Sequence, residues 1–269
     1  IYLTIDSSIQ LITEKAVATM KEKFNTDWAV FTVMDAKTGA IVASSTSPNF
    51  NPNDTNTIKE YMNPLISYQY EPGSVMKVFS FASAIEEGKY DGEEKFASGS
   101  YTLKDGTVIR DSERKGWGTI SFDEGFARSS NVAATTLALR LGIDSLSGYY
   151  DALGFGKKTG IELSNEAIGD IEMVYESELA TASFGQGVSV TAIQMLQALT
   201  SITNDGTVIK PYLVDKIVDQ NGNVTYEGKR EVVKKVYSSS TVNKMHELMK
   251  KVVEINKVWN VSNVNVMGK

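Results

Sequence analysis

Ser74 and Lys77 are the residues of this sequence whose types and spacing best suit nucleophilic catalysis. A Pro-Gly pair ends a loop just before Ser74, and a helix is predicted over 74–87. A serine in the first turn of a helix lies near free backbone N–H groups, which favour negative charge developing on oxygen. Lys77 follows three residues later on the same helix face, and a lysine that is buried beside a hydroxyl loses proton affinity. The neutral amine can then act as a general base for the serine, although S-x-x-K by itself also occurs by chance.

A second polar group, Ser129-Ser130-Asn131, follows at a predicted break between two short helices within 121–141. A break of this kind exposes side chains. Ser129 could relay a proton there, and Asn131 offers both a donor and an acceptor to a peptide amide. An ordinary helix N-cap explains the same residue types equally well.

Lys269 is a third candidate, because it follows Gly268 and an apolar run over 264–267 that is predicted to start a strand. The tripeptide K-T-G also occurs at 37–39, in a hairpin turn, and at 158–160, in a loop. Both copies precede runs with a structural pattern, so Lys269 is the better candidate for a functional lysine.

Hydrophobic periodicity predicts the elements that position these residues. Helices are expected over 6–24, 74–87, 144–153, 191–203 and 238–254, in addition to the two within 121–141. Hairpins are expected over 28–43, 101–110 and 212–227, and residues 46–72 are polar and irregular. Because strands lie near both ends and helices fill the middle, the expected fold is α+β. An antiparallel sheet is built from both ends of the chain and packs against helices, with a central, mostly helical subdomain.

The composition excludes several other classes of protein. With 269 residues, of which 42% are hydrophobic, the chain can form one large domain or two small ones. A net charge of −6 argues against nucleic acid as a partner. Cysteine is absent, and His246 is the only histidine, so a Ser-His-Asp triad or a histidine metal site would have to use it. We expect no metal and no cofactor.

The order S-x-x-K, S-x-N and a lysine strand resembles that of the penicillin-interacting serine enzymes. Longer segments are similar to class B penicillin-binding proteins. They are YEPGSVMK (70–77), GFARSSNV (125–132) and SFGQGVSVT (183–191), together with the structural segments DAKTGAI (35–41) and GFGKKTGI (154–161). The resemblance covers essentially the whole chain.

The resemblance implies a serine-type D,D-transpeptidase. Ser74 would attack the penultimate D-alanine carbonyl of a stem peptide, and Lys77 would take its proton. Ser129 would relay a proton to the departing D-alanine, and Asn131 would hold the substrate amide. Lys269 would supply positive charge near Ser129. Gln186 and Gly187 are expected to support substrate binding.

The resemblance also implies the surroundings of the domain. Residues 1–269 would form a transpeptidase domain that ends at the lysine of its K-T-G motif, with the threonine and glycine absent. A membrane anchor and a pedestal would lie upstream, and the domain would face the extracellular or periplasmic side of the cell membrane. The expected partners are peptidoglycan stem peptides ending in D-Ala-D-Ala, β-lactams and proteins of a cell-wall synthesis complex.

Three other functions are compatible with the same nucleophile. A class A β-lactamase needs a glutamate and a water for deacylation. Glu162, Glu166, Glu172 and Glu176 follow the S-x-N segment, but no E-x-x-L-N pattern occurs. A D-alanyl-D-alanine carboxypeptidase would pass the acyl group to water, and a non-catalytic β-lactam sensor domain would be acylated once.

Overall fold

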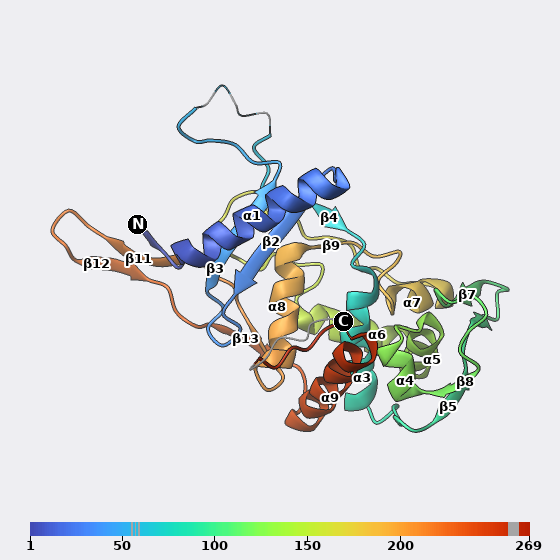
Figure 1. The fold of residues 1–269 in the computed structure, drawn as a ribbon. Coiled ribbons are helices and arrows are strands. Elements are labelled where there is room, and N and C mark those ends of the chain that lie inside the picture. Colours follow the sequence, from blue (N-terminus) through green and yellow to red (C-terminus); the bar gives the residue numbers. More distant parts are fainter. Residues whose placement is uncertain (55, 57, 59, 258–263) are drawn as a thin grey trace. The chain divides into compact units, whose positions relative to one another are not determined.

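The computed structural model describes residues 1–54, 56, 58, 60–257 and 264–269, and Figure 1 shows its ribbon. The chain divides into two compact units, neither of which is continuous in sequence. The first unit contains residues 1–70, 153–169 and 190–235, and the second contains 71–152, 170–189 and 236–269. The first unit holds strands from both ends of the chain and the second is mostly helical, which confirms the predicted α+β class.

The first unit combines short antiparallel sheets with two longer helices. Its elements are β1 (Tyr2–Leu3), α1 (Ser7–Phe24), β2 (Ala29–Met34), β3 (Ile41–Ser47), α2 (Pro64–Ser67), β4 (Gln69–Tyr70), β9 (Val190–Thr191), α8 (Ala192–Thr203), β10 (Thr207–Ile209), β11 (Val214–Val218), β12 (Val224–Glu227) and β13 (Val232–Lys235). The strand order β1-β11-β12 joins the N-terminal strand to late strands, as predicted, and β2-β3, β4-β9 and β10-β13 form separate pairs.

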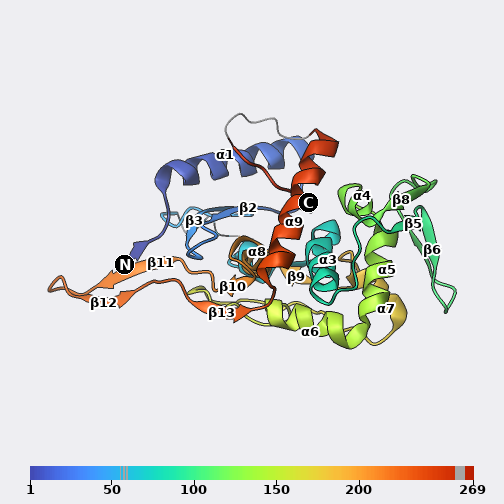
Figure 2. The ribbon, with the colours of Figure 1, turned by 90° about the horizontal axis from the view of Figure 1, so that it is seen from below.

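Helix α1 begins and ends where local chemistry directs it. The Asp6 carboxylate accepts hydrogen bonds from the backbone N–H groups of Ser8 and Ile9, which caps the first turn. Asn25 ends the helix in the left-handed conformation, with φ of 47°. Thr13 and Val17 are the buried residues of α1, and the helix packs along β2 and β3 (Figure 2).

The second unit is built around α3. Its elements are a 3₁₀ turn (Gly73–Met76), α3 (Lys77–Glu86), β5 (Lys95–Ala97), β6 (Ser100–Thr102), β7 (Val108–Arg110), β8 (Thr119–Ser121), α4 (Phe122–Ala127), α5 (Asn131–Leu141), α6 (Ile143–Leu153), α7 (Glu176–Ala182) and α9 (Ser239–Asn256). Helix α3 is buried along nearly its whole length and packs against α5 and α9, which flank it in Figure 2. Phe81 of α3 meets Phe126 of α4 edge to face, with ring centroids 4.9 Å apart. A helix buried on all sides holds its first residues firmly.

The structure corrects the predicted secondary structure at several places. The strand prediction over 264–267 is wrong, because this segment pairs with no described strand. Instead the Gly268 N–H donates to the Met249 carbonyl of α9. Residues 46–72 are not irregular throughout, because β3 continues to Ser47 and α2 and β4 follow; positions 55, 57 and 59 lie outside the described residues. Helix α7 and the pairing of β5 with β8 were not predicted.

Among the described residues, no helix is both long enough and apolar enough to cross a membrane.

Candidate active site

Ser74 and Lys77 lie at the start of the buried helix, as the spacing predicts. Ser74 is in the 3₁₀ turn that leads into α3, and its side chain is exposed. Lys77 is the first residue of α3 and is 0% exposed. The Lys77 Nζ donates to the Ser74 Oγ at 3.0 Å. A solvent-accessible hydroxyl therefore contacts an amine that is shielded from water.

The amine of Lys77 also contacts the S-x-N segment. Its Nζ donates to the Ser129 carbonyl at 2.7 Å, to the Ser129 Oγ at 3.1 Å and to the Asn131 Oδ1 at 2.7 Å. Burial lowers the pKa of Lys77 to about 7, although the negative charge of Asp111 raises it. The direction of this shift agrees with the loss of proton affinity predicted for a lysine buried beside a hydroxyl.

The turn between α4 and α5 presents Ser129 and Asn131 to Lys77. Ser129 has a φ of 60°, a left-handed conformation that is uncommon for serine. Ser130 is the N-cap of α5 and accepts from the Ala133 N–H at 3.0 Å, so the N-cap interpretation holds for this residue. The Asn131 Nδ2 donates to the Arg110 carbonyl at 2.8 Å, which turns the Oδ1 toward the lysine.

Lys269 lies beside the same turn. Its Nζ donates to the Phe126 carbonyl at 2.7 Å and lies 4.5 Å from the centre of the Phe126 ring. The same carbonyl accepts from the Ser129 N–H at 3.0 Å. Burial, with the positive charge of Lys77, lowers the pKa of Lys269 to about 6. Burial therefore disfavours the positive charge that was expected near Ser129.

The segment 185–187 packs against the turn that carries the nucleophile. The Gly73 N–H donates to the Gly185 carbonyl at 3.0 Å, and Gly185 has a φ of 79°. A Cβ on Gly185 would overlap the Gly73 carbonyl oxygen, so the approach requires glycine. The Gly187 N–H donates to the Glu71 carboxylate at 2.8 Å, and the Gln186 side chain is exposed. Gln186 and Gly187 therefore lie next to the turn that carries Ser74.

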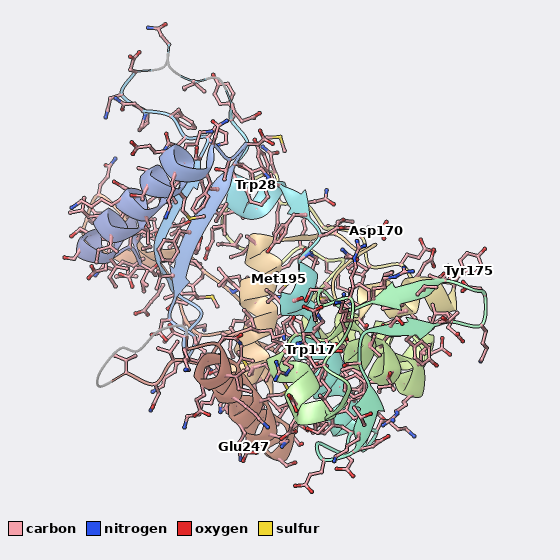
Figure 3. All side chains as sticks on the ribbon, turned by 45° about the vertical axis from the view of Figure 1, so that its right-hand side comes forward. Trp28, Trp117, Asp170, Tyr175, Met195 and Glu247 are labelled. Atoms are coloured by element: carbon pink, nitrogen blue, oxygen red, sulfur yellow. The ribbon has the colours of Figure 1, made fainter. Side chains whose placement is uncertain are left out.

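Two further residues lie around the S-x-N turn. Trp117, labelled in Figure 3, is half-buried, and the Arg128 guanidinium lies 5.5 Å from its ring centre. Asp111 directly follows β7 and is 3% exposed, and its carboxylate accepts from Ser130 and Val132. Sequence reasoning missed Asp111, since an aspartate at the end of a hairpin gives no local signal of such a contact.

The part of the chain that the structure describes contains no group of three histidine, cysteine, aspartate or glutamate side chains that could hold a metal ion.

Comparison with known proteins gives consistent matches. The family model described as penicillin binding protein transpeptidase domain matches residues 29–269. Stage V sporulation protein D of Bacillus subtilis is 33% identical over 93% of this chain and 40% of its own length. The probable peptidoglycan D,D-transpeptidase PenA of Neisseria flavescens is 29% identical over 94% of this chain and 61% of its own.

A solved structure shares the fold. It is penicillin-binding protein 3 of Mycobacterium tuberculosis in complex with ampicillin, with a TM-score of 0.86 and 28% identity over 93% of this chain and 57% of that one. The chain thus spans about two fifths to three fifths of the length of the proteins it matches.

Proposed function

Since this chain belongs to the penicillin-binding protein transpeptidase family, we propose that it is a serine-type D,D-transpeptidase that acts on peptidoglycan stem peptides through an acyl-enzyme on Ser74. The substrate would be the D-Ala-D-Ala end of a stem peptide. The relative from N. flavescens, which is named as a peptidoglycan D,D-transpeptidase, supports this substrate class.

The hydrogen bonds of the Lys77 amine are the main support for this function. A neutral amine has two N–H donors and one lone pair. The two shortest contacts of Nζ, at 2.7 Å, are to the Ser129 carbonyl and the Asn131 amide oxygen, which can only accept. Both N–H groups are thereby used, and the lone pair remains for a hydroxyl. Ser74 Oγ, at 3.0 Å, can donate its proton to that lone pair.

Acylation then moves protons among Ser74, Lys77 and Ser129. As the Ser74 Oγ bonds to the carbonyl carbon, its proton passes to Lys77 Nζ. When the C–N bond breaks, Ser129 gives its hydroxyl proton to the leaving nitrogen and regains one from Lys77, whose Nζ lies 3.1 Å from its Oγ. The amine of a second stem peptide then attacks the ester carbonyl and gives up a proton to Lys77. As the C–O bond breaks, Ser74 Oγ takes a proton back from Lys77. We assign Asn131 to holding the substrate amide, and Lys269, Gln186 and Gly187 to binding the rest of the substrate.

β-Lactams would acylate the same serine, because they resemble the D-Ala-D-Ala end. The likeness to a structure in complex with ampicillin supports this assignment. We further propose that the domain works on the extracellular or periplasmic face of the cell membrane, anchored through an upstream segment and associated with other cell-wall synthesis proteins. Labelling of intact cells with a membrane-impermeant fluorescent penicillin would test the location; labelling that requires cell lysis would contradict it.

Two of the glutamates considered for activating a deacylating water in a β-lactamase have structural roles. Glu166 is buried and accepts from both the N–H and the hydroxyl of Thr159 and from the Gly160 N–H. Glu162 accepts from the Leu213 N–H and the Tyr226 hydroxyl. Carboxylates held in this way are poor candidates for activating a deacylating water, which favours the transpeptidase over the β-lactamase.

Intact-mass spectrometry after incubation with benzylpenicillin tests the proposal. We expect a stable adduct on Ser74 that is absent in Ser74→Ala and retained in Ser112→Ala, a matched control at an exposed serine of the same unit. Penicillin hydrolysis without an adduct would instead indicate the β-lactamase. A stem-peptide analogue ending in D-Ala-D-Ala, offered with and without an amine acceptor, separates the remaining functions. Exchange to the amine indicates a transpeptidase, hydrolysis alone a carboxypeptidase, and no turnover a sensor.

A further inference from the structure

Asp111 is a buried carboxylate whose hydrogen-bond donors are all uncharged. It is 3% exposed, and none of the ion pairs formed within the described residues includes it. Its oxygens accept from the Gly99 N–H at 2.8 Å, from the Ser130 hydroxyl at 2.9 and 3.1 Å and from the Val132 N–H at 3.0 Å. A buried carboxylate without a bound cation is costly, so its presence calls for a reason.

These bonds fasten the S-x-N turn to the neighbouring hairpin. The Ser130 hydroxyl donates to Asp111 while it accepts from the Ala133 N–H, so the N-cap of α5 is itself held by the carboxylate. The backbone carbonyl of the preceding residue, Arg110, accepts a hydrogen bond from the Asn131 Nδ2. Asp111 and Arg110 therefore fix the α5 end of the turn that supplies the Lys77 acceptors.

Asp111 also supplies the negative charge that acts on the general base. Two titratable groups lie around Lys77. The Asp111 carboxylate, from the end of β7, raises the pKa of Lys77, and the Lys269 amine, from the C-terminal segment, has its own pKa lowered by burial and by the charge of Lys77. The other side chains around the amine come from the 3₁₀ turn, the S-x-N turn and the segment after α7, and they are the uncharged Ser74, Ser129, Asn131 and Phe184. Of the two groups, only Asp111 favours a protonated Lys77.

We propose that Asp111 is a positioning residue for acylation, which holds the S-x-N turn against Lys77 and favours the ammonium that forms as Ser74 loses its proton. This inference rests on the proposed function, since it assigns Asp111 a part in the same step. Its two parts, placement and charge, can be separated by two substitutions.

Asp111→Asn keeps the size of the side chain and removes its charge. Ser130→Ala keeps the charge and removes the hydroxyl that donates to Asp111 and caps α5. The measurement is the second-order rate of benzylpenicillin acylation between pH 5 and pH 9. For Asp111→Asn we expect the inflection of the profile to move to lower pH by about 1 unit or more, with a lower plateau. For Ser130→Ala we expect a plateau about tenfold lower and an inflection that does not move.

If the pH–rate profile of Asp111→Asn has its inflection at the same pH as the unmodified protein, Asp111 does not favour the ammonium of Lys77, and the electrostatic part of the inference is overturned. An unchanged plateau in Ser130→Ala would overturn the placement part, and this result does not depend on Asp111→Asn folding. A merely structural role would lower the plateau of both variants without moving either inflection.

A titration of the Lys77 ¹³Cε signal by NMR, in a Ser74→Ala background, separates this inference from the proposed function. That background cannot be acylated at Ser74, so the titration does not require activity. We expect the Lys77 midpoint to fall when Asp111→Asn is added. If the unmodified protein is not acylated but this shift occurs, the proposed function fails and the electrostatic inference stands. If acylation occurs but the Lys77 midpoint does not shift, the proposed function stands and the electrostatic inference fails.

Discussion

The pH dependence of acylation follows directly from the burial of Lys77. In the proposed mechanism Lys77 is the general base. It must be neutral to accept the Ser74 proton, and its pKa is lowered to about 7. Raising the pH through this value converts the ammonium to the amine, so the acylation rate should rise with pH and level off above it. At one unit below the pKa about one tenth of the lysines are neutral, and at one unit above about nine tenths are. The rate at pH 8 should therefore be about tenfold that at pH 6.

Stopped-flow fluorescence with a reporter penicillin measures this rate under single-turnover conditions. The β-lactam carboxylate stays ionised over the whole interval, so a change in rate reports on the protein. Lys77→Arg is the informative companion variant, because a guanidinium does not lose its proton at these pH values. It should be slow at both pH values, with no inflection. A ratio of rates near one in the unmodified protein would refute the assignment of Lys77 as the base.

Other substitutions test the surroundings of the site. Gly185→Ala should displace Gly73 and slow acylation at least tenfold, because the new Cβ would lie 2.5 Å from the Gly73 nitrogen and would overlap its oxygen. Gly106→Ala is the matched control, with a φ of 88° and open space around the new Cβ, and should lower stability by only about 1 kcal/mol without slowing acylation. Equal rates in the two variants would contradict the steric argument. Phe126→Ala should lower the free energy of unfolding by about 3–5 kcal/mol, measured by urea denaturation, because the ring is fully buried. Phe126→Leu should lower the free energy of unfolding by less than Phe126→Ala does. A loss below about 1 kcal/mol in Phe126→Ala would show that the core collapses around the missing ring and would contradict this expectation.

The residues that the sequence could identify are those placed by local structure. Ser74 and Lys77 share one helical turn, so their contact follows from spacing alone. Asn131 and Ser129 flank a helix N-cap, and the break between two helices predicted that their side chains would be presented together. The predictions for α1 and α8 held for the same reason, since each helix has its cap and its apolar residues within its own segment.

The remaining features depend on contacts between distant segments. Asp111 reaches Ser130 and Gly99 only because the hairpin of β6 and β7 packs at the start of α5. The apolar run at 264–267 resembles a strand, but a strand forms only when a partner supplies its hydrogen bonds. Helix α7 is short and begins after Tyr175, in a stretch whose apolar spacing is too brief to show a period.

The contact between Gly73 and Gly185 is a backbone hydrogen bond, and this limits which sequence changes the site can tolerate. The contact involves no side chain on either partner, and it lies one residue from the nucleophile. Side chains around this contact, such as the exposed Gln186 and the half-buried Trp117, can vary in size and polarity without moving the Ser74 hydroxyl. An insertion or deletion in either loop would break the register between them and displace it. Variation in the surrounding side chains is therefore separated from the position of the Ser74 hydroxyl, which the backbone contact fixes.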